Sequence, residues 1–338
     1  MGQIRISSLL VGMLIFLLSA PTLYAEEKAA STQPTIGVWV ITNYVRDETK
    51  NVTPASEFNI KNVRIIGSGN PAPKWSYHLM GEFFSSTGSP TLMQAWVSYS
   101  ANRYATFRFG QFKYPFGYEA YQSILLWKFV NPAYVTTDVV KKLGRSGNIY
   151  RDIGVELAGE YTINENINAV YKFMVLNGDG ANKDDMNNRK DYAGFLGARL
   201  PTNILTGLSL YKGVYTEIGN NLNESALGLM LSIKNQRYSA QAEYIKATYK
   251  NTVGRDTEPS GYYGYITYML MSMVEVGARY DIYEKDTNIS SVKTSRLTLS
   301  TGYYFNKVNR ILLNYEIRDN DADSSVGNLL TIQLQAAM

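Results

Sequence analysis

The chain has 338 residues, with 33 Lys and Arg against 29 Asp and Glu, and its net charge of +4 is too weak to indicate nucleic acid as a partner. It contains no Cys, so an exported form cannot depend on disulfide bonds for its stability. Tyr and Gly are equally abundant, at 27 residues each, which is unusual for a soluble domain of this size.

The N-terminal segment Met1–Ala25 predicts a secretory signal peptide. A basic residue, Arg5, precedes an apolar run from Leu9 to Leu18, and the small residue Ala25 ends the segment. This run is shorter than the roughly twenty apolar residues of a membrane-spanning helix, and no later segment is longer, which excludes a helical membrane protein. A retained N-terminal anchor is the alternative. Cleavage after Ala25 leaves residues 26–338 as a single domain.

The rest of the chain is a succession of segments of about ten residues in which apolar and polar residues alternate. In Val274–Ile282 every second residue is apolar, and Glu275, Arg279 and Asp281 fall between the apolar positions. This period of two predicts strands with one apolar and one polar face. Sixteen strands are predicted, at residues 36–45, 57–67, 74–84, 91–100, 103–112, 150–161, 166–177, 190–200, 204–215, 224–233, 237–249, 260–270, 273–283, 294–304, 309–318 and 327–338.

The connections between these strands alternate between two lengths. Short turns occur at residues 101–102, 163–165, 201–203, 235–236 and 306–308, and longer polar loops at 46–56, 113–148, 178–189, 217–223, 251–259, 284–293 and 319–326. Short turns on one side, long loops on the other and an even number of strands are typical of bacterial outer-membrane proteins. The sequence therefore predicts an all-β fold, a transmembrane antiparallel β-barrel in the outer membrane of a Gram-negative bacterium. Its surroundings would be outer-membrane lipid and lipopolysaccharide.

One segment also carries a family resemblance. Phe107–Glu119, with the sequence FRFGQFKYPFGYE, resembles the phosphate-selective porin O and P family. Further blocks follow in the expected order, at Arg151–Val155, Val175–Gly180, Ala278–Asp281 and Gly302–Asn306. The resemblance extends over nearly all of residues 26–338. It implies sixteen strands, a homotrimer, and a long third extracellular loop that folds into the lumen.

The composition of the longest loop, Lys113–Asn148, leads to the same expectation. Its aromatic and aliphatic residues, among them Tyr114, Phe116, Trp127 and Phe129, are more than an exposed loop would carry. Long loops without regular structure are also usually functional in compact domains. We therefore predict that this loop folds into the lumen and forms a constriction. A surface loop or a loop at a trimer contact is the alternative.

The charges of this loop and of the barrel wall are the candidate selectivity residues. The loop has five basic residues against Glu119 and Asp138, a net charge of +3, as large as that of the whole of residues 26–338. Charges that line a constriction set ion preference, so a weakly anion-preferring pore is the hypothesis, with phosphate as one candidate solute. Alternatives are solvated loop charges that face lipopolysaccharide phosphates, and salt bridges that brace the wall. The candidate residues are Lys113, Lys128, Lys141, Lys142 and Arg145 in the loop, and Arg108, Arg279 and Arg310 on the wall.

The remaining function classes have little support in the sequence. The one His, His78, has no recognisable Ser or Asp constellation around it, so we expect no catalytic site, and no cofactor is predicted. Asp179, Asp184 and Asp185 do not follow the spacing of a calcium loop, so no metal site is predicted. The expected function is passive diffusion of small hydrophilic solutes and ions. A structural or adhesin-like barrel without a transport role is the alternative.

Overall fold

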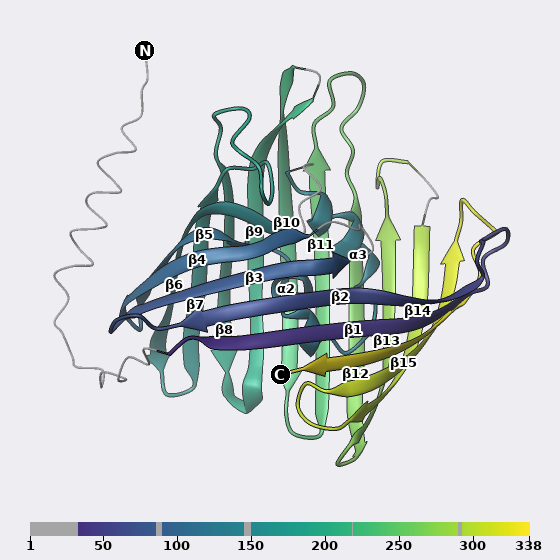
Figure 1. The fold of residues 1–338 in the computed structure, drawn as a ribbon. Helices are drawn as coiled ribbons and strands as arrows, with labels where there is room; N and C mark the ends of the chain where they lie inside the picture. The colour runs from purple at the N-terminus through teal and green to yellow at the C-terminus, as the bar shows by residue number, and fades with distance from the viewer. Residues whose placement is uncertain (1–32, 86–89, 145–149, 218, 290–292) are drawn as a thin grey trace.

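A computed structural model describes residues 33–85, 90–144, 150–217, 219–289 and 293–338. In these residues, sixteen antiparallel strands close into one barrel, in which each strand pairs with its neighbours in sequence and the first pairs with the last. Figure 1 shows the strands of the N-terminal third crossing the front of the barrel obliquely, with short helices inside. The predicted signal peptide, residues 1–25, lies outside the described residues. No helix in the described ranges is long and apolar enough to span a membrane.

All sixteen predicted strands are confirmed, and no boundary differs from its prediction by more than four residues. The strands are β1 (Thr35–Asp47), β2 (Ser56–Gly69), β3 (Trp75–Ser85), β4 (Thr91–Asn102), β5 (Ala105–Lys113), β6 (Arg151–Asn164), β7 (Ile167–Leu176), β8 (Asp191–Leu200), β9 (Ile204–Glu217), β10 (Asn220–Lys234), β11 (Tyr238–Tyr249), β12 (Ser260–Met271), β13 (Val274–Glu284), β14 (Lys293–Tyr304), β15 (Arg310–Asn320) and β16 (Leu329–Ala337).

One predicted loop is wrong. Residues 217–223 were expected to form a polar loop, but β9 continues to Glu217 and β10 begins at Asn220. The two strands pair to their ends, with Asn220 opposite Glu217 and Leu222 opposite Tyr215. A run of Asn residues therefore extends a hairpin here, because the ladder of backbone hydrogen bonds does not depend on apolar side chains.

The two faces of each strand meet different surroundings. In β10, Leu227, Leu229 and Leu231 are exposed on the outside of the barrel, whereas Gly228 and Met230 between them are buried. The same alternation places the apolar stripes of β13 and β15 outside and their charged residues inside. An apolar exterior and a polar interior are the arrangement of a barrel that is surrounded by lipid.

Strands β1 and β16 complete the barrel. They pair from Trp39 opposite Ala337 to Asp47 opposite Leu329. The backbones of Val38 and Met338 extend this pairing with two hydrogen bonds of 3.0 and 3.1 Å. Closure leaves no unpaired strand edge, so the barrel is stabilised without disulfide bonds.

The described part of the connection between β5 and β6 lies inside the barrel and packs against its wall. It contains the short helices α2 (Tyr118–Tyr121), η1 (Ile124–Leu126), α3 (Tyr134–Asp138) and η2 (Val140–Lys142). Its apolar side chains pack with inward-facing residues of β7–β13 into one buried cluster, and Tyr114, Val135 and Leu143 are fully buried within it. We call residues 114–144 the inner loop. Its apolar composition is thus explained by packing within the barrel.

Candidate functional site

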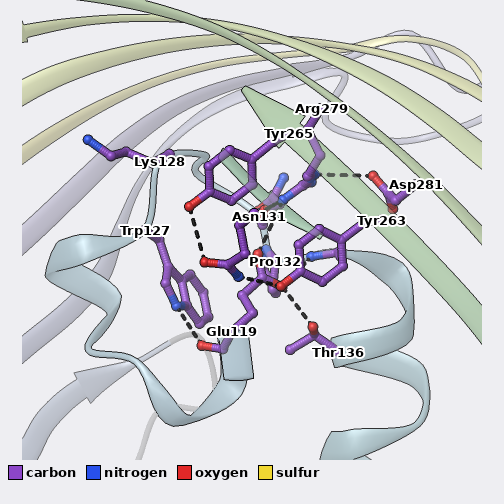
Figure 2. Close-up of polar contacts among 12 residues, drawn as sticks. Glu119, Trp127, Lys128, Asn131, Pro132, Thr136, Tyr263, Tyr265, Arg279 and Asp281 are labelled. Atoms are coloured by element: carbon purple, nitrogen blue, oxygen red, sulfur yellow. Dashed lines mark hydrogen bonds and ion pairs between the residues drawn. The ribbon is translucent and has the colours of Figure 1, made fainter. Parts of the chain in front are cut away.

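The inner loop is fixed to one side of the barrel by the inward-facing charges of β13–β15. Arg279 donates a hydrogen bond of 2.8 Å to the carbonyl of Asn131, and Arg296 donates one of 2.7 Å to the carbonyl of Pro132. Figure 2 shows Arg279 between Asp281 and the loop backbone at Asn131 and Pro132. These contacts give the loop a defined path along the wall.

Wall residues also accept hydrogen bonds from the loop backbone. The amide of Val130 donates to Asn314 at 2.8 Å, and the amide of Tyr134 donates to Asp281 at 3.0 Å. On β11, Glu243 accepts from the amide of Tyr118 at 2.6 Å. Buried loop backbone has no access to bulk water, so these polar wall residues supply the hydrogen bonds that it needs.

The charges on this wall form a buried network. Arg296 contacts Asp281 and Glu316 at 3.0 Å each, and Arg279 contacts Asp281 at 3.2 Å and Glu119 of the loop at 3.5 Å. All five side chains are at least 94% buried. Buried charges are stable only when they are paired and hydrogen-bonded, so each member depends on the others.

Glu119 connects the network to the fold of the loop itself. Its carboxylate accepts hydrogen bonds from the amide of Ala133 at 2.9 Å and from the hydroxyl of Thr136 at 2.7 Å. Its backbone carbonyl accepts from the indole of Trp127 at 3.0 Å (Figure 2). Burial raises the pKa of Glu119, and the charge of Arg279 opposes that rise.

Several of the predicted selectivity residues serve this attachment. Arg279 and Arg310 are almost fully buried, and Arg310 donates a hydrogen bond of 2.6 Å to the carbonyl of Trp127. Lys128 forms a salt bridge of 2.7 Å with Glu275. The structure therefore places Arg279, Arg310 and Lys128 in the contact between loop and wall.

The other predicted residues are spread over the remaining interior. Arg108 lies 3.2 Å from Glu156 and 4.5 Å from the ring centroid of Trp96, and it lines a cavity. Lys141 and Lys142 are exposed, and Lys142 pairs with Asp138 at 3.0 Å. Arg145 lies outside the described residues. The structure therefore brings Arg108 and Lys113 to one cavity and Lys113 and Lys141 to another, but it does not unite the seven described candidates.

The space that the inner loop leaves free lies on the opposite side, against β1–β6. A cavity of 510 Å³ and a second of 330 Å³ share four lining residues, Arg64, Lys113, Ile124 and Arg151. The larger cavity also contacts Lys61, Lys141 and Arg296, with Glu82 and Asp138 as its acidic residues. Among the described residues that line the smaller cavity, Arg64, Arg108, Lys113 and Arg151 are charged and none is acidic. We call Arg64, Arg108, Lys113 and Arg151 the basic strip.

The strip is held in position by neighbouring groups. Arg64 pairs with Glu82 at 2.6 Å, and Glu82 also accepts hydrogen bonds from Asn62 and from the amide of Val63 at 2.9 Å each. Lys113 donates to the carbonyls of Ala120 and Gln122 at 2.6 and 2.5 Å. The cations are thus fixed in the cavity wall rather than freely mobile.

Three cavity-lining cations were not predicted from the sequence: Lys61, Arg64 and Arg151. Lys61 is the extra residue of a β-bulge, because Ile41 is opposite Asn62 while Thr42 is opposite Ile60. Arg151 follows a loop, at a point where the consecutive residues Gln111, Phe112 and Lys113 of the paired strand are all buried. At both places, the alternation of apolar and polar residues does not predict which side chain faces the lumen. Arg64 could have been found, since it alternates with Val63 and Ile65 in a predicted strand.

The described residues contain no group of three or more His, Asp or Glu side chains arranged to hold a metal ion. His78 stacks on Trp96 with ring centroids 5.3 Å apart and lines the smaller cavity. Its ring is therefore a packing element of the interior wall.

Comparison with known proteins gives consistent results. The family model for phosphate-selective porin O and P matches residues 38–198 and 208–337. A comparison with curated protein sequences gave no match. Similar solved structures include an anion-selective porin from Comamonas acidovorans, with a TM-score of 0.70, 15% identity, and coverage of 90% of this chain and 99% of that one.

Two further solved structures have the same fold. The trimer form of OmpT from Vibrio cholerae has a TM-score of 0.65 and 11% identity over 90% of this chain and 99% of that one. The outer-membrane channel DcaP of Acinetobacter baumannii has a TM-score of 0.59 and 11% identity over 93% and 99%. At such low identities, the structural similarity shows a shared barrel fold alone. The family match, in contrast, covers most of the chain. The chain therefore belongs to the phosphate-selective porin O and P family, and it is a channel of the Gram-negative outer membrane for passive diffusion of small hydrophilic solutes.

Proposed function

We propose that this porin prefers anions, and that the basic strip of Arg64, Arg108, Lys113 and Arg151 sets the preference. The observation that carries the proposal is that two adjoining cavities share three of these four cations. Charges at the wall of a narrow, low-dielectric passage act on a passing ion with little screening, so an excess of cations concentrates anions there.

The basic strip does not include Arg279 and Arg310, two of the selectivity residues expected from the sequence. Arg279 pairs with Asp281 and Glu119, and Arg310 donates to the carbonyl of Trp127 in the inner loop, so both hold the loop. Neither of them lines the two cavities. In the smaller cavity the hydrogen-bond partners of Lys113 are neutral carbonyls, which supply no counter-charge. Support also comes from the Comamonas acidovorans structure, which is described as an anion-selective porin. Inorganic phosphate is one candidate among small anions.

A homotrimer in contact with outer-membrane lipid and lipopolysaccharide completes the proposal. The Vibrio cholerae OmpT structure is a trimer form, and this chain has a large apolar exterior that suits both lipid and a second copy. Chemical crosslinking of the protein in native membranes tests this assembly. A ladder that ends at three subunits supports it, and a monomer alone contradicts it.

The pair Arg64 and Glu82 offers a test of the basic strip, because the two charges are 2.6 Å apart and opposite in sign. In planar bilayers under a potassium chloride gradient, Arg64→Gln should move the reversal potential toward cation preference, and Glu82→Gln should move it toward anion preference. Lys307→Gln, at an exposed turn residue, is the matched control and should change nothing. Shifts of the same sign for the Arg64 and Glu82 variants would refute the assignment of selectivity to the basic strip. Absence of conductance in the wild-type protein would favour a structural barrel.

A further inference from the structure

A separate cavity of 170 Å³ lies between the inner loop and the wall formed by β7, β8 and β9. The loop contributes Pro115, Phe116, Gly117, Tyr118 and Tyr121, and the wall contributes Val170, Lys172, Phe195, Arg199, Leu205 and Ser209. Arg199 is close to the turn at 201–203, so the cavity lies toward the short-turn end of the barrel. Tyr121 also lines the smaller cavity of the basic strip, so the two spaces are neighbours.

The charged residues of this cavity favour an anion. Lys172 and Arg199 line it, and none of its described lining residues is acidic. Arg199 is 49% exposed and has a long contact of 3.6 Å with Glu160, which is 41% exposed. Such an exposed pair is weak, so Arg199 can turn to a ligand at little cost. Lys172 donates a hydrogen bond of 2.7 Å to the hydroxyl of Tyr121, which keeps its ammonium group at the cavity.

The rest of the lining favours an aromatic ring. The ring of Phe195 lies across Gly197 and Gly207, which are opposite each other on β8 and β9. A Cβ atom at either glycine would come within 2.7 Å of Cζ of Phe195, so only glycine leaves room for this ring position. Phe195, Tyr118 and Tyr121 therefore surround the cavity with aromatic groups, which pack well against a further ring.

The loop side is fixed as firmly as the wall. Gly117 has a φ of 73°, a conformation that favours glycine, and it precedes α2. The amide of Tyr118 is held by Glu243. Because the site is formed before any ligand arrives, little ordering is needed on binding.

From these features we infer that the cavity binds small aromatic carboxylates, with Lys172 and Arg199 at the carboxylate and Tyr121 and Phe195 at the ring. This inference rests on the proposed function, since it assumes that anions enter the lumen. The cavity volume of 170 Å³ is below the roughly 300–1,000 Å³ of sites for drug-sized ligands, so the site suits a ligand with a single ring rather than a larger one. Inorganic phosphate would leave the aromatic half of the lining without a partner.

Sodium benzoate is the probe, with cyclohexanecarboxylate and acetate as anions of the same charge without an aromatic ring. Isothermal titration of the detergent-solubilised protein should give the highest affinity for benzoate. Lys172→Gln should weaken benzoate binding by about tenfold, as expected for the loss of one charge-assisted hydrogen bond. Tyr121→Leu should reduce the preference for benzoate over cyclohexanecarboxylate. Lys307→Gln should leave both affinities unchanged.

Equal affinities for benzoate and cyclohexanecarboxylate, or unchanged benzoate binding in Lys172→Gln, would overturn the inference. The chloride conductance of each variant in planar bilayers verifies that its barrel is folded. Bilayer recordings and titrations together separate the two proposals. Anion preference without benzoate discrimination refutes this site alone, whereas cation preference in the wild-type protein refutes the proposed function.

Discussion

At the residue scale, two inward-facing arginines of the same barrel have different surroundings. Arg279 is enclosed by Asp281, Glu119 and a loop carbonyl, whereas Arg64 lines both cavities of the open side. Alternation along a strand predicts that both face inward. It cannot predict which of them the loop covers, because that depends on contacts between residues that are more than a hundred positions apart.

The buried network gives the first prediction at this scale. Asp281→Asn removes the carboxylate that pairs with both Arg279 and Arg296, and it leaves two buried cations with too little counter-charge. Loss of one partner from a buried ion pair typically costs about 3–5 kcal/mol, so we expect a clearly lower unfolding temperature in detergent. We also expect more frequent closures of single channels, because the loop is less firmly held. Asp184→Asn, at an exposed loop residue, is the control, and equal stability of both variants would contradict the role of the network.

At the scale of elements, the strands were predictable and the interior was only partly so. Each strand has a local signal, the alternation of faces, and the apolar composition of Lys113–Asn148 correctly indicated a packed loop. The bulge at Lys61 and the covered end of β5 have no such signal, so Lys61 and Arg151 were missed. The charge of the loop does not show which cations face the cavities, because Lys128 pairs with Glu275 of the wall whereas Lys113 lines both cavities.

Replacement of the inner loop tests its role as a constriction. A variant in which a short turn replaces residues 115–149 should still form the barrel, since the strand ladder does not pass through the loop. Its single-channel conductance should rise severalfold, and its anion preference should fall while Arg64 and Arg108 remain. Shortening of residues 321–326 is the comparison and should have little effect. An unchanged conductance in the first variant would show that the loop does not limit the passage.

At the scale of the whole molecule, the apolar exterior is what separates this barrel from a soluble one. Leu227, Leu229 and Leu231 of β10 are 39–48% exposed, and similar stripes occur on the other strands. In water such a surface would promote association, but in a bilayer it matches the hydrocarbon core. The interior, in contrast, has nearly all of the buried charge.

This difference predicts a lipid-dependent cost for a charge on the outside. Leu229→Arg, in the central part of β10, should reduce the free energy of folding into bilayers by about 2–4 kcal/mol, the cost of Arg near the membrane midplane. Val253→Arg, at an 88% exposed loop residue, should cost almost nothing. Urea titration of both variants in lipid vesicles measures the difference, and equal stability would contradict the assignment of β10 to the lipid-facing wall.

If the basic strip sets the selectivity of this porin, chloride should carry more of the current than potassium. The most direct test is the reversal potential of the purified wild-type protein in planar bilayers under a potassium chloride gradient. We expect stable conductance and a reversal potential of the sign set by chloride. A reversal potential of the sign set by potassium would contradict it.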